Sequence, residues 1–128
     1  MIIDETNYVD KAEKAILELK EKKDRKGEPI VTTSKIRNLL AMVADIYNDV
    51  VNSKEEKLSK DIVGHINYMK LRFYYEAGRE SSVKNLLDTA KVFEVINGIG
   101  DSRSNYILFS RYMEALVAFR KYYGGKDE

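Results

Sequence analysis

The chain has 128 residues, no cysteine, and 22 basic against 21 acidic side chains, which give a formal net charge of +1. This length predicts a single domain with its own hydrophobic core; the missing cysteines exclude disulfides and thiolate metal sites, and the absence of a long apolar run or a signal-peptide pattern predicts a cytoplasmic protein without membrane contact. The balanced charge excludes a binder driven by overall basicity, so a nucleic-acid surface would need local segregation of cations.

Apolar residues recur at helical spacing along the whole chain, which predicts an all-α fold: a compact single-domain bundle of about five helices. The first helix, at 8–25, has a narrow apolar stripe, so residues 1–30 are expected to form an outer N-terminal part. The other helices are expected at 34–52, 59–77, 82–97 and 102–123. We expect Gly78 to end the third helix as a left-handed residue and residues 124–128 to form a frayed tail.

The side chains able to carry chemistry form no known catalytic pattern. His65, the only histidine, has Asp61 one helical turn before it; a hydrogen bond or a weak two-ligand metal site is one interpretation, and a residue at the edge of an apolar helix face is the favoured one. Asp45 and Asp49 share a helix face and would suit Mg²⁺ held through waters, but a solvated acidic face is favoured. The segment GIGDS at 98–102 lacks the lysine of a P-loop. We therefore expect no enzymatic activity, no cofactor and no metal.

The stretch TTSKIR, residues 32–37, places three hydroxyl side chains and two cations at the start of the second predicted helix. Unpaired N–H groups and the positive end of the helix dipole make such a start a seat for a phosphate. Lys35 and Arg37 point about 200° apart around a helix, so only a ligand at the helix end is within reach of both. A redundant N-cap with solvated cations explains the stretch equally well.

The stretch YMKLRFYYEAGRE, residues 68–80, interleaves Lys70, Arg72 and Arg79 with three tyrosines and a phenylalanine. Such mixtures bind nucleic acid, with cations at phosphates and rings stacked on bases. Packing of these rings in the helical core is the favoured interpretation, with the hydroxyl groups reaching the surface.

A second basic and aromatic segment, FSRYMEALVAFRKYYGG, ends the last predicted helix. Arg120 and Lys121 stand directly before two tyrosines near the end of the chain. Glu114 follows Arg111 by three residues, so we expect it to pair either with Arg111 or with a cation from another helix, and we expect this pairing to be structural rather than catalytic.

Taken in order, TTSKIR, KLRFYYEAGRE and RYMEALVAFRKYYGG resemble one family: the small subunit of type III-A CRISPR effector complexes, the Csm small subunit. The similarity covers nearly the whole chain from Val31 onward. It implies a compact helical bundle without enzymatic activity, several copies of which stack head to tail beside a filament of backbone subunits. In that family the copies line the channel that holds guide RNA paired to target RNA. Target cutting belongs to the backbone subunits, and DNA cleavage to the large subunit.

The resemblance implies that the chain grips the ribose-phosphate backbone of RNA without reading bases, and a changing guide sequence makes such contacts sufficient. The implied partners are guide RNA, target RNA, the backbone subunits, the large subunit and other copies of the chain. The candidate RNA contacts are Lys35, Arg37, Arg79, Arg120 and Lys121, with Lys60, Lys70 and Arg72 as further candidates. We expect the first five of these on one contiguous face. The alternative is a helical protein–protein adaptor without nucleic-acid contact, whose tyrosines anchor a protein partner.

Overall fold

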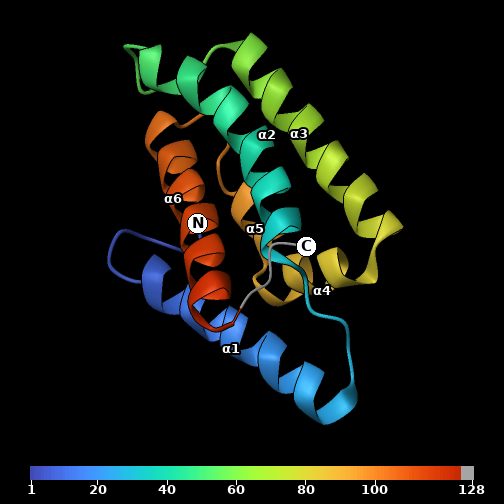
Figure 1. Cartoon of the computed structure of the whole chain (residues 1–128). Helices are drawn as coiled ribbons and strands as arrows, with labels where there is room; N and C mark the ends of the chain where they lie inside the picture. The colour runs from blue at the N-terminus through green and yellow to red at the C-terminus, as the bar shows by residue number, and fades with distance from the viewer. Residues whose placement is uncertain (125–128) are drawn as a thin grey trace.

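A computed structural model describes residues 1–124, and within that range the chain forms α-helices and no strands (Figure 1). The helices are α1 (Tyr8–Lys26), α2 (Thr33–Asn52), α3 (Lys60–Arg79), α4 (Ser81–Thr89), α5 (Val92–Asn97) and α6 (Arg103–Tyr122). The predicted all-α class is therefore confirmed. Of the tail that was expected to fray, residues 125–128 lie outside the described part of the chain.

Helix α6 has the most extensive packing in the bundle, because it contacts α2 and α1 along much of its length and also contacts α5. Its inner face carries large side chains that are fully buried, among them Tyr106, Phe109 and Leu116. It runs antiparallel to α2, since Arg103 at its start bonds to Val50 and Arg120 at its end bonds to Val31 (Figure 1). This broad buried face explains why the apolar residues of this segment occupy more than one side of the helix.

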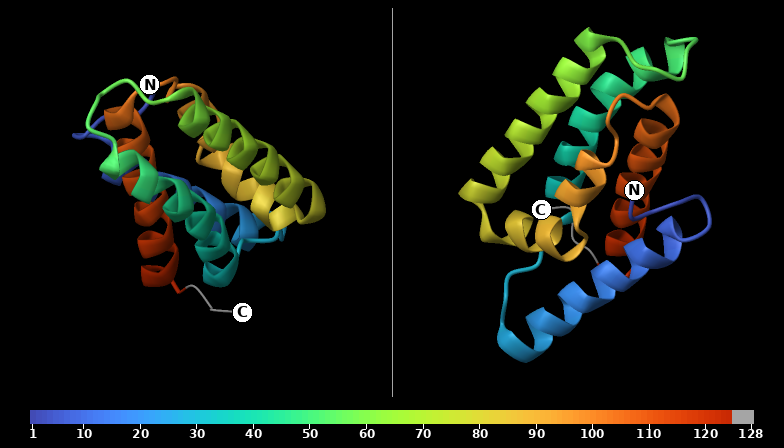
Figure 2. Two further views of the ribbon diagram at one scale, coloured as in Figure 1. Left: turned by 90° about the horizontal axis from the view of Figure 1, so that it is seen from above. Right: turned by 180° about the vertical axis from the view of Figure 1, so that it is seen from behind.

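Helix α3 lies at one edge of the bundle, with α2 and α4 as its packing partners (Figures 1 and 2). Its core-facing stripe consists of Ile66, Met69, Phe73 and Ala77, which follow helical spacing. Outside this stripe, Tyr74 and Lys70 contact α5, while Tyr68, Leu71, Arg72 and Tyr75 are exposed. The helix therefore offers a long surface to whatever binds the protein.

Two helix boundaries differ from those expected. The predicted helix at 82–97 is broken at Ala90 and Lys91, and Lys91 adopts a left-handed φ of 54°. The break keeps Ala90 and Val92 buried while the chain changes direction. Gly78 does not end α3, which continues to Arg79 and stops where the extended Glu80 becomes the N-cap of α4.

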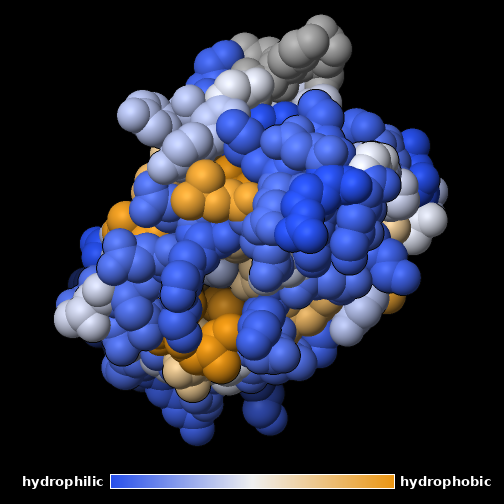
Figure 3. Space-filling view, turned by 90° about the horizontal axis from the view of Figure 1, so that it is seen from below, coloured by the Kyte–Doolittle hydropathy of each residue, from blue (hydrophilic) through white to orange (hydrophobic). Residues whose placement is uncertain are grey.

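The face that carries α1 is mostly hydrophilic when seen from below, with a few apolar residues visible in hollows between charged ones (Figure 3). Helix α1 packs against α4 and α6 through Ala12, Ile16 and Leu19. No helix within residues 1–124 combines the length and apolarity that crossing a membrane requires.

Candidate nucleic-acid interface

The three hydroxyl side chains of the TTSKIR stretch lie in different environments at the start of α2. Thr32 has extended backbone angles and its side-chain oxygen accepts a hydrogen bond from the Lys35 N–H at 3.3 Å, so it is the N-cap. Thr33 is fully buried within the bundle, and Ser34 is partly exposed. The cap therefore needs one hydroxyl, and phosphate binding at this helix start stays a prediction.

Two of the predicted cations come together where the start of α2 meets the end of α3. The Lys35 ammonium forms an ion pair with Glu80, and Arg79 Nη1 lies 3.3 Å from Glu76 Oε1. Both cations line two neighbouring hollows, of about 180 and 530 Å³. We call the four residues Lys35, Glu76, Arg79 and Glu80 the α2–α3 corner. It is a solvent-accessible cluster in which each cation has a carboxylate partner.

Three further candidate residues are spread along α3. Lys60 is exposed in the first turn, which puts it ~28 Å from Arg79 along the helix axis. Lys70 donates a hydrogen bond to the Asn97 side chain. Arg72 is exposed at the rim of a hollow of about 340 Å³ between α2 and α3, and it forms no hydrogen bond or ion pair with any described residue. Helix α3 therefore carries the α2–α3 corner at one end and cations along its length.

The tyrosines of α3 are not where core packing was expected. Tyr68 is 60 % exposed and Tyr75 is 60 % exposed, whereas Phe73 between them is fully buried. The expectation was wrong because the core-facing stripe leaves no room on its arc for residues displaced from it by 100° or more. The Arg79 guanidinium lies 5.6 Å from the centroid of the Tyr75 ring, a cation–π contact. Tyr74 instead stacks on Phe93, with ring centroids 3.9 Å apart.

Arg120 departs most from the predicted site. Its side chain is only 7 % exposed, and its Nε donates a 2.7 Å hydrogen bond to the Val31 carbonyl oxygen. Burial lowers the pKa of Arg120, because the charged form loses hydration. The expectation that five cations share one contiguous face was therefore wrong. The helical spacing could have predicted this burial, because Arg120 follows Met113 by seven residues and Leu116 by four, and both of those residues are fully buried.

Arg37 and Lys121 are exposed, but neither lines the two hollows at the α2–α3 corner. Arg37 leaves α2 on the side away from Lys35, as the ~200° between residues two apart requires. Lys121 lies in the last turn of α6. Both residues have polar interactions of their own. Their contact with RNA stays a prediction.

The start of α6, which follows the GIGDS segment, is already occupied by a carboxylate of the protein. Ser102 is the N-cap, and Glu56 from the preceding loop accepts hydrogen bonds from the Ser102 hydroxyl, the Ser104 hydroxyl and the Ser104 N–H. These bonds lower the pKa of Glu56, the side-chain bond from Ser102 contributing most. Glu56 thus fills the position that an anion would take at this helix start. No local sequence pattern predicts this contact, because Glu56 and Ser102 are 46 positions apart.

The candidate acidic and histidine ligands lie near one another without forming a metal centre. His65, Asp45 and Asp49 line the same hollow between α2 and α3. Within residues 1–124, no three histidine, cysteine, aspartate or glutamate side chains are grouped so that they would hold a metal ion.

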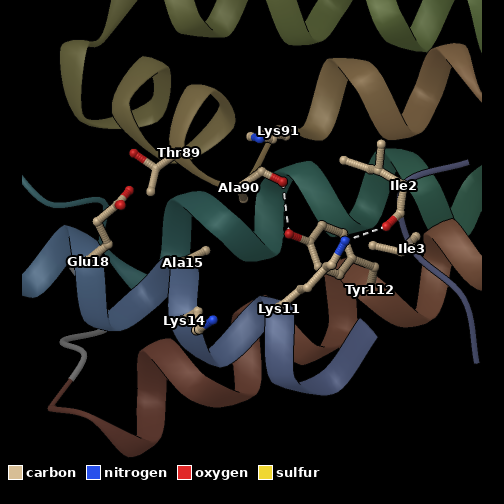
Figure 4. A pocket seen from close by; sticks show the side chains of 10 residues that line it. All are labelled: Ile2, Ile3, Lys11, Lys14, Ala15, Glu18, Thr89, Ala90, Lys91 and Tyr112. Atoms are coloured by element: carbon tan, nitrogen blue, oxygen red, sulfur yellow. Dashed lines mark hydrogen bonds between the residues drawn. The ribbon is translucent and has the colours of Figure 1, made fainter. Parts of the chain in front are cut away.

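A separate hollow of about 340 Å³ lies between the N-terminal segment, α1, the α4–α5 junction and α6 (Figure 4). Two of its polar groups are bonded within the protein: the Tyr112 hydroxyl donates to the Ala90 carbonyl oxygen at 2.8 Å, and the Lys11 ammonium donates to the Ile2 carbonyl oxygen. Burial raises the pKa of Tyr112 to about 12. These bonds give the hollow a structural role in holding the N-terminal segment and the α4–α5 junction.

Comparison with known proteins gives a consistent result. The model of the family described as Csm2 Type III-A matches residues 6–126. The chain is 45 % identical over 126 residues to the CRISPR system Cms protein Csm2 of Streptococcus thermophilus, covering 98 % of each chain. It is 39 % identical over 98 residues to the protein of that name from Mycobacterium tuberculosis strain H37Rv, covering 77 % of this chain and 79 % of the relative. For the Enterococcus italicus protein the identity is 33 % over 120 residues, with 88 % and 86 % covered.

Proposed function

Because the chain belongs to the Csm2 type III-A family, as its sequence motifs suggested, we propose that it is the non-catalytic small subunit of a type III-A CRISPR effector complex. In this proposal several copies stack along the channel that holds guide RNA and target RNA. Each copy grips the ribose-phosphate backbone without sequence specificity. Its protein partners are the backbone subunits, the large subunit and neighbouring copies.

The distribution of charge supports an RNA contact through α3. This helix holds four cationic and two acidic side chains, a net charge of +2, so the rest of the chain carries a net charge of −1. Helices α1 and α6 are also net positive, at +2 and +3; α3 lies at the edge of the bundle, where its cations Lys60, Arg72 and Arg79 are exposed. A polyanion would be drawn to that edge even though the protein is nearly neutral.

The observation that carries the proposal most directly is the α2–α3 corner. Lys35 of α2 and Arg79 of α3 are 44 positions apart in the sequence, yet both line the same two hollows. Cations at the rim of an open hollow suit phosphate oxygens, which carry no sequence information. Arg72 and Lys60 would extend the contact along α3. Arg120 is left out of this proposal because it is buried.

The test is removal of the two corner charges. The double variant Lys35→Gln/Arg79→Gln should weaken binding of the full-length chain to RNA by a similar factor for unrelated sequences. The dependence of the logarithm of affinity on the logarithm of salt concentration should become shallower by about two units, one for each lost phosphate contact. Fluorescence anisotropy with labelled single-stranded and duplex RNA, measured over a salt series, gives both quantities.

Lys22→Gln/Arg25→Gln is the matched control. It also removes two cations that have carboxylate partners, Glu18 and Glu21, but it does so on α1. This control should leave RNA affinity within about twofold of the wild type. Equal losses from both double variants, losses that depend on the base sequence, or a wild-type chain that binds no RNA at low salt would each contradict the proposal.

A further inference from the structure

We infer, on the basis of the proposed RNA contact, that α3 binds RNA with accessible bases by stacking them on Tyr68 and Tyr75 while Arg72 and Arg79 hold the intervening phosphates. This goes beyond a grip on the backbone, because it specifies the class of RNA as one whose bases are unpaired or splayed from a helix. We call Tyr68, Arg72, Tyr75 and Arg79 the α3 ladder.

The four residues form one line along the outer side of α3. Their spacing of four, three and four residues keeps them within about 60° of one another around the helix. Aromatic and cationic side chains alternate, and the two rings are ~10 Å apart along the axis with Arg72 near the midpoint. A single strand laid along this line would meet a ring, a guanidinium, a second ring and a second guanidinium in turn.

Three of the four ladder residues form no hydrogen bond or ion pair with a described residue, whereas Arg79 pairs with Glu76 and lies over the Tyr75 ring. Neither Tyr68 nor Tyr75 gives its hydroxyl to a hydrogen bond with a described residue, in contrast with the buried Tyr106 and Tyr112. Arg72 is likewise unpaired among the described residues. Among the large hydrophobic side chains of residues 1–124, nine are exposed, and four of these lie between positions 68 and 75 of α3. An exposed concentration of this kind marks a binding surface.

The charge of the ladder separates the two classes of partner that aromatic surfaces serve. Tyrosine and arginine anchor protein interfaces as well as nucleic acids. Among the four ladder residues, however, two carry a positive charge and none carries a negative one. The contact between Arg79 and Tyr75 at 5.6 Å also shows a ring and a guanidinium already placed side by side, the pairing that ring stacking and phosphate binding use together. These two observations favour RNA.

A continuous duplex does not suit the ladder, because the faces of its bases are covered by neighbouring base pairs. Every unpaired base has an exposed face, so stacking is tolerant of sequence. The ladder is therefore compatible with a changing guide. It predicts that single-stranded RNA is preferred over blunt duplex RNA of the same length.

The experiment compares the full-length wild type with Tyr68→Ala/Tyr75→Ala and Tyr68→Phe/Tyr75→Phe. The probes are a labelled oligouridylate, an abasic ribose-phosphate chain of equal length and a blunt RNA duplex. We expect the alanine variant to lose at least about fivefold in affinity for the oligouridylate, which corresponds to about 1 kcal/mol. The phenylalanine variant keeps the rings and should bind as the wild type does. On the abasic chain, all three proteins should bind equally.

Tyr122→Ala is the control for loss of an exposed ring elsewhere, since Tyr122 is 79 % exposed at the end of α6; it should leave binding unchanged. Unchanged oligouridylate binding by the alanine variant, or an equal loss on the abasic chain, overturns the inference. So does an alanine variant that binds RNA normally but no longer associates with other subunits, which would make this face a protein interface. If the wild type binds RNA and loses affinity only in Lys35→Gln/Arg79→Gln, the stacking inference fails and the proposed function stands. A wild type that binds none of the probes refutes both.

Discussion

Helices α3 and α6 have the same length, 20 residues each, and both contain tyrosines and arginines, but they use these side chains in opposite ways. On α6, Tyr106 donates to the Val43 carbonyl oxygen at 2.6 Å and Arg103 donates to the Val50 and Val51 carbonyl oxygens at 3.1 Å. On α3, Tyr68, Arg72 and Tyr75 are exposed and their polar groups bond to no described residue, and Arg79 pairs only with the Glu76 side chain on the surface.

The difference shows that the position around the helix, and not the residue type, decides whether such a side chain is structural or available to a ligand. Arg103 donates to the Val50 and Val51 carbonyl oxygens in the last turn of α2, where the helix itself leaves carbonyl groups unsatisfied; the Val50 oxygen also accepts the N–H of the C-cap Ser53. Arg120 meets Val31 just before α2 begins. Arginines from α6 therefore fix α2 near both of its ends. Neither exposed arginine of α3 donates to a backbone carbonyl of a described residue: Arg72 forms no hydrogen bond or ion pair there, and Arg79 pairs with the Glu76 side chain.

The largest difference between the two helices should appear when one tyrosine of each is replaced by alanine. Tyr106→Ala takes away a fully buried ring and leaves a cavity, so it should lower the free energy of unfolding by about 3 kcal/mol or more. Tyr75→Ala removes an exposed ring and should change that free energy by less than about 0.5 kcal/mol. Chemical denaturation followed by circular dichroism measures both. Tyr106→Phe, which loses only the hydroxyl, should fall between them at about 1 kcal/mol. Similar costs for Tyr106→Ala and Tyr75→Ala would remove the contrast between the helices.

The arginines should show a smaller but parallel contrast. Arg120→Met removes a charged donor to a buried carbonyl, and we expect a destabilisation of about 2 kcal/mol. Arg72→Met should leave stability unchanged within about 0.5 kcal/mol and weaken RNA binding instead. Thermal unfolding and fluorescence anisotropy on both variants separate the two effects. A stable Arg120→Met variant with impaired RNA binding would reverse our assignment of these residues.

The smallest effect concerns the helix starts. Ser59 alone caps α3 by its side chain, whereas Ser102 and Glu56 together serve α6. The pKa of Glu56 is below its ordinary value of 4.5 in the folded protein, so its stabilising contribution is present above that value and is lost as the pH falls through the depressed folded value. Glu56→Gln should therefore lower the melting temperature at neutral pH, and the difference from wild type should shrink in acid.

Glu55→Gln is the control for that measurement, because the neighbouring Glu55 carboxylate makes no hydrogen bond with a described residue. It should melt as the wild type does at every pH. A Glu56→Gln deficit that is independent of pH would show that the side-chain carboxylate is not the group that holds the start of α6.

The sequence predicted the helices well where the apolar period and the breaks agreed. The stripe of Ile66, Met69 and Phe73 placed α3 correctly, and the hydroxyl run at 32–34 placed the start of α2 to within one residue, since the helix expected from 34 begins at Thr33. The break at Lys91 had no such signal, because LLDTAKVFEVIN continues the apolar period without glycine or proline. The left-handed backbone there is imposed by tertiary packing, which local propensity does not report.

The candidate site was predicted less well, because it depends on which face of a helix its neighbours cover. The pairing of Lys35 with Glu80 joins residues 45 positions apart, and no local pattern encodes it. Tyr68 and Tyr75 could have been placed on the surface, since the core-facing stripe of α3 already excluded them. The spacing of Arg120 from Leu116 likewise indicated burial. Arginine is usually exposed, however, so an interpretation based on residue type placed it on the surface.

The carboxylates of the α2–α3 corner limit how tightly a ligand can bind there. Any polyanion that reaches Lys35 and Arg79 has to displace Glu80 and Glu76, so one ion pair is traded for another in similar solvent. The net gain from each trade is small, and neither cation is left bare when the ligand departs. A surface built in this way releases its cargo as readily as it takes it up, and lasting occupancy has to come from many such surfaces acting in series.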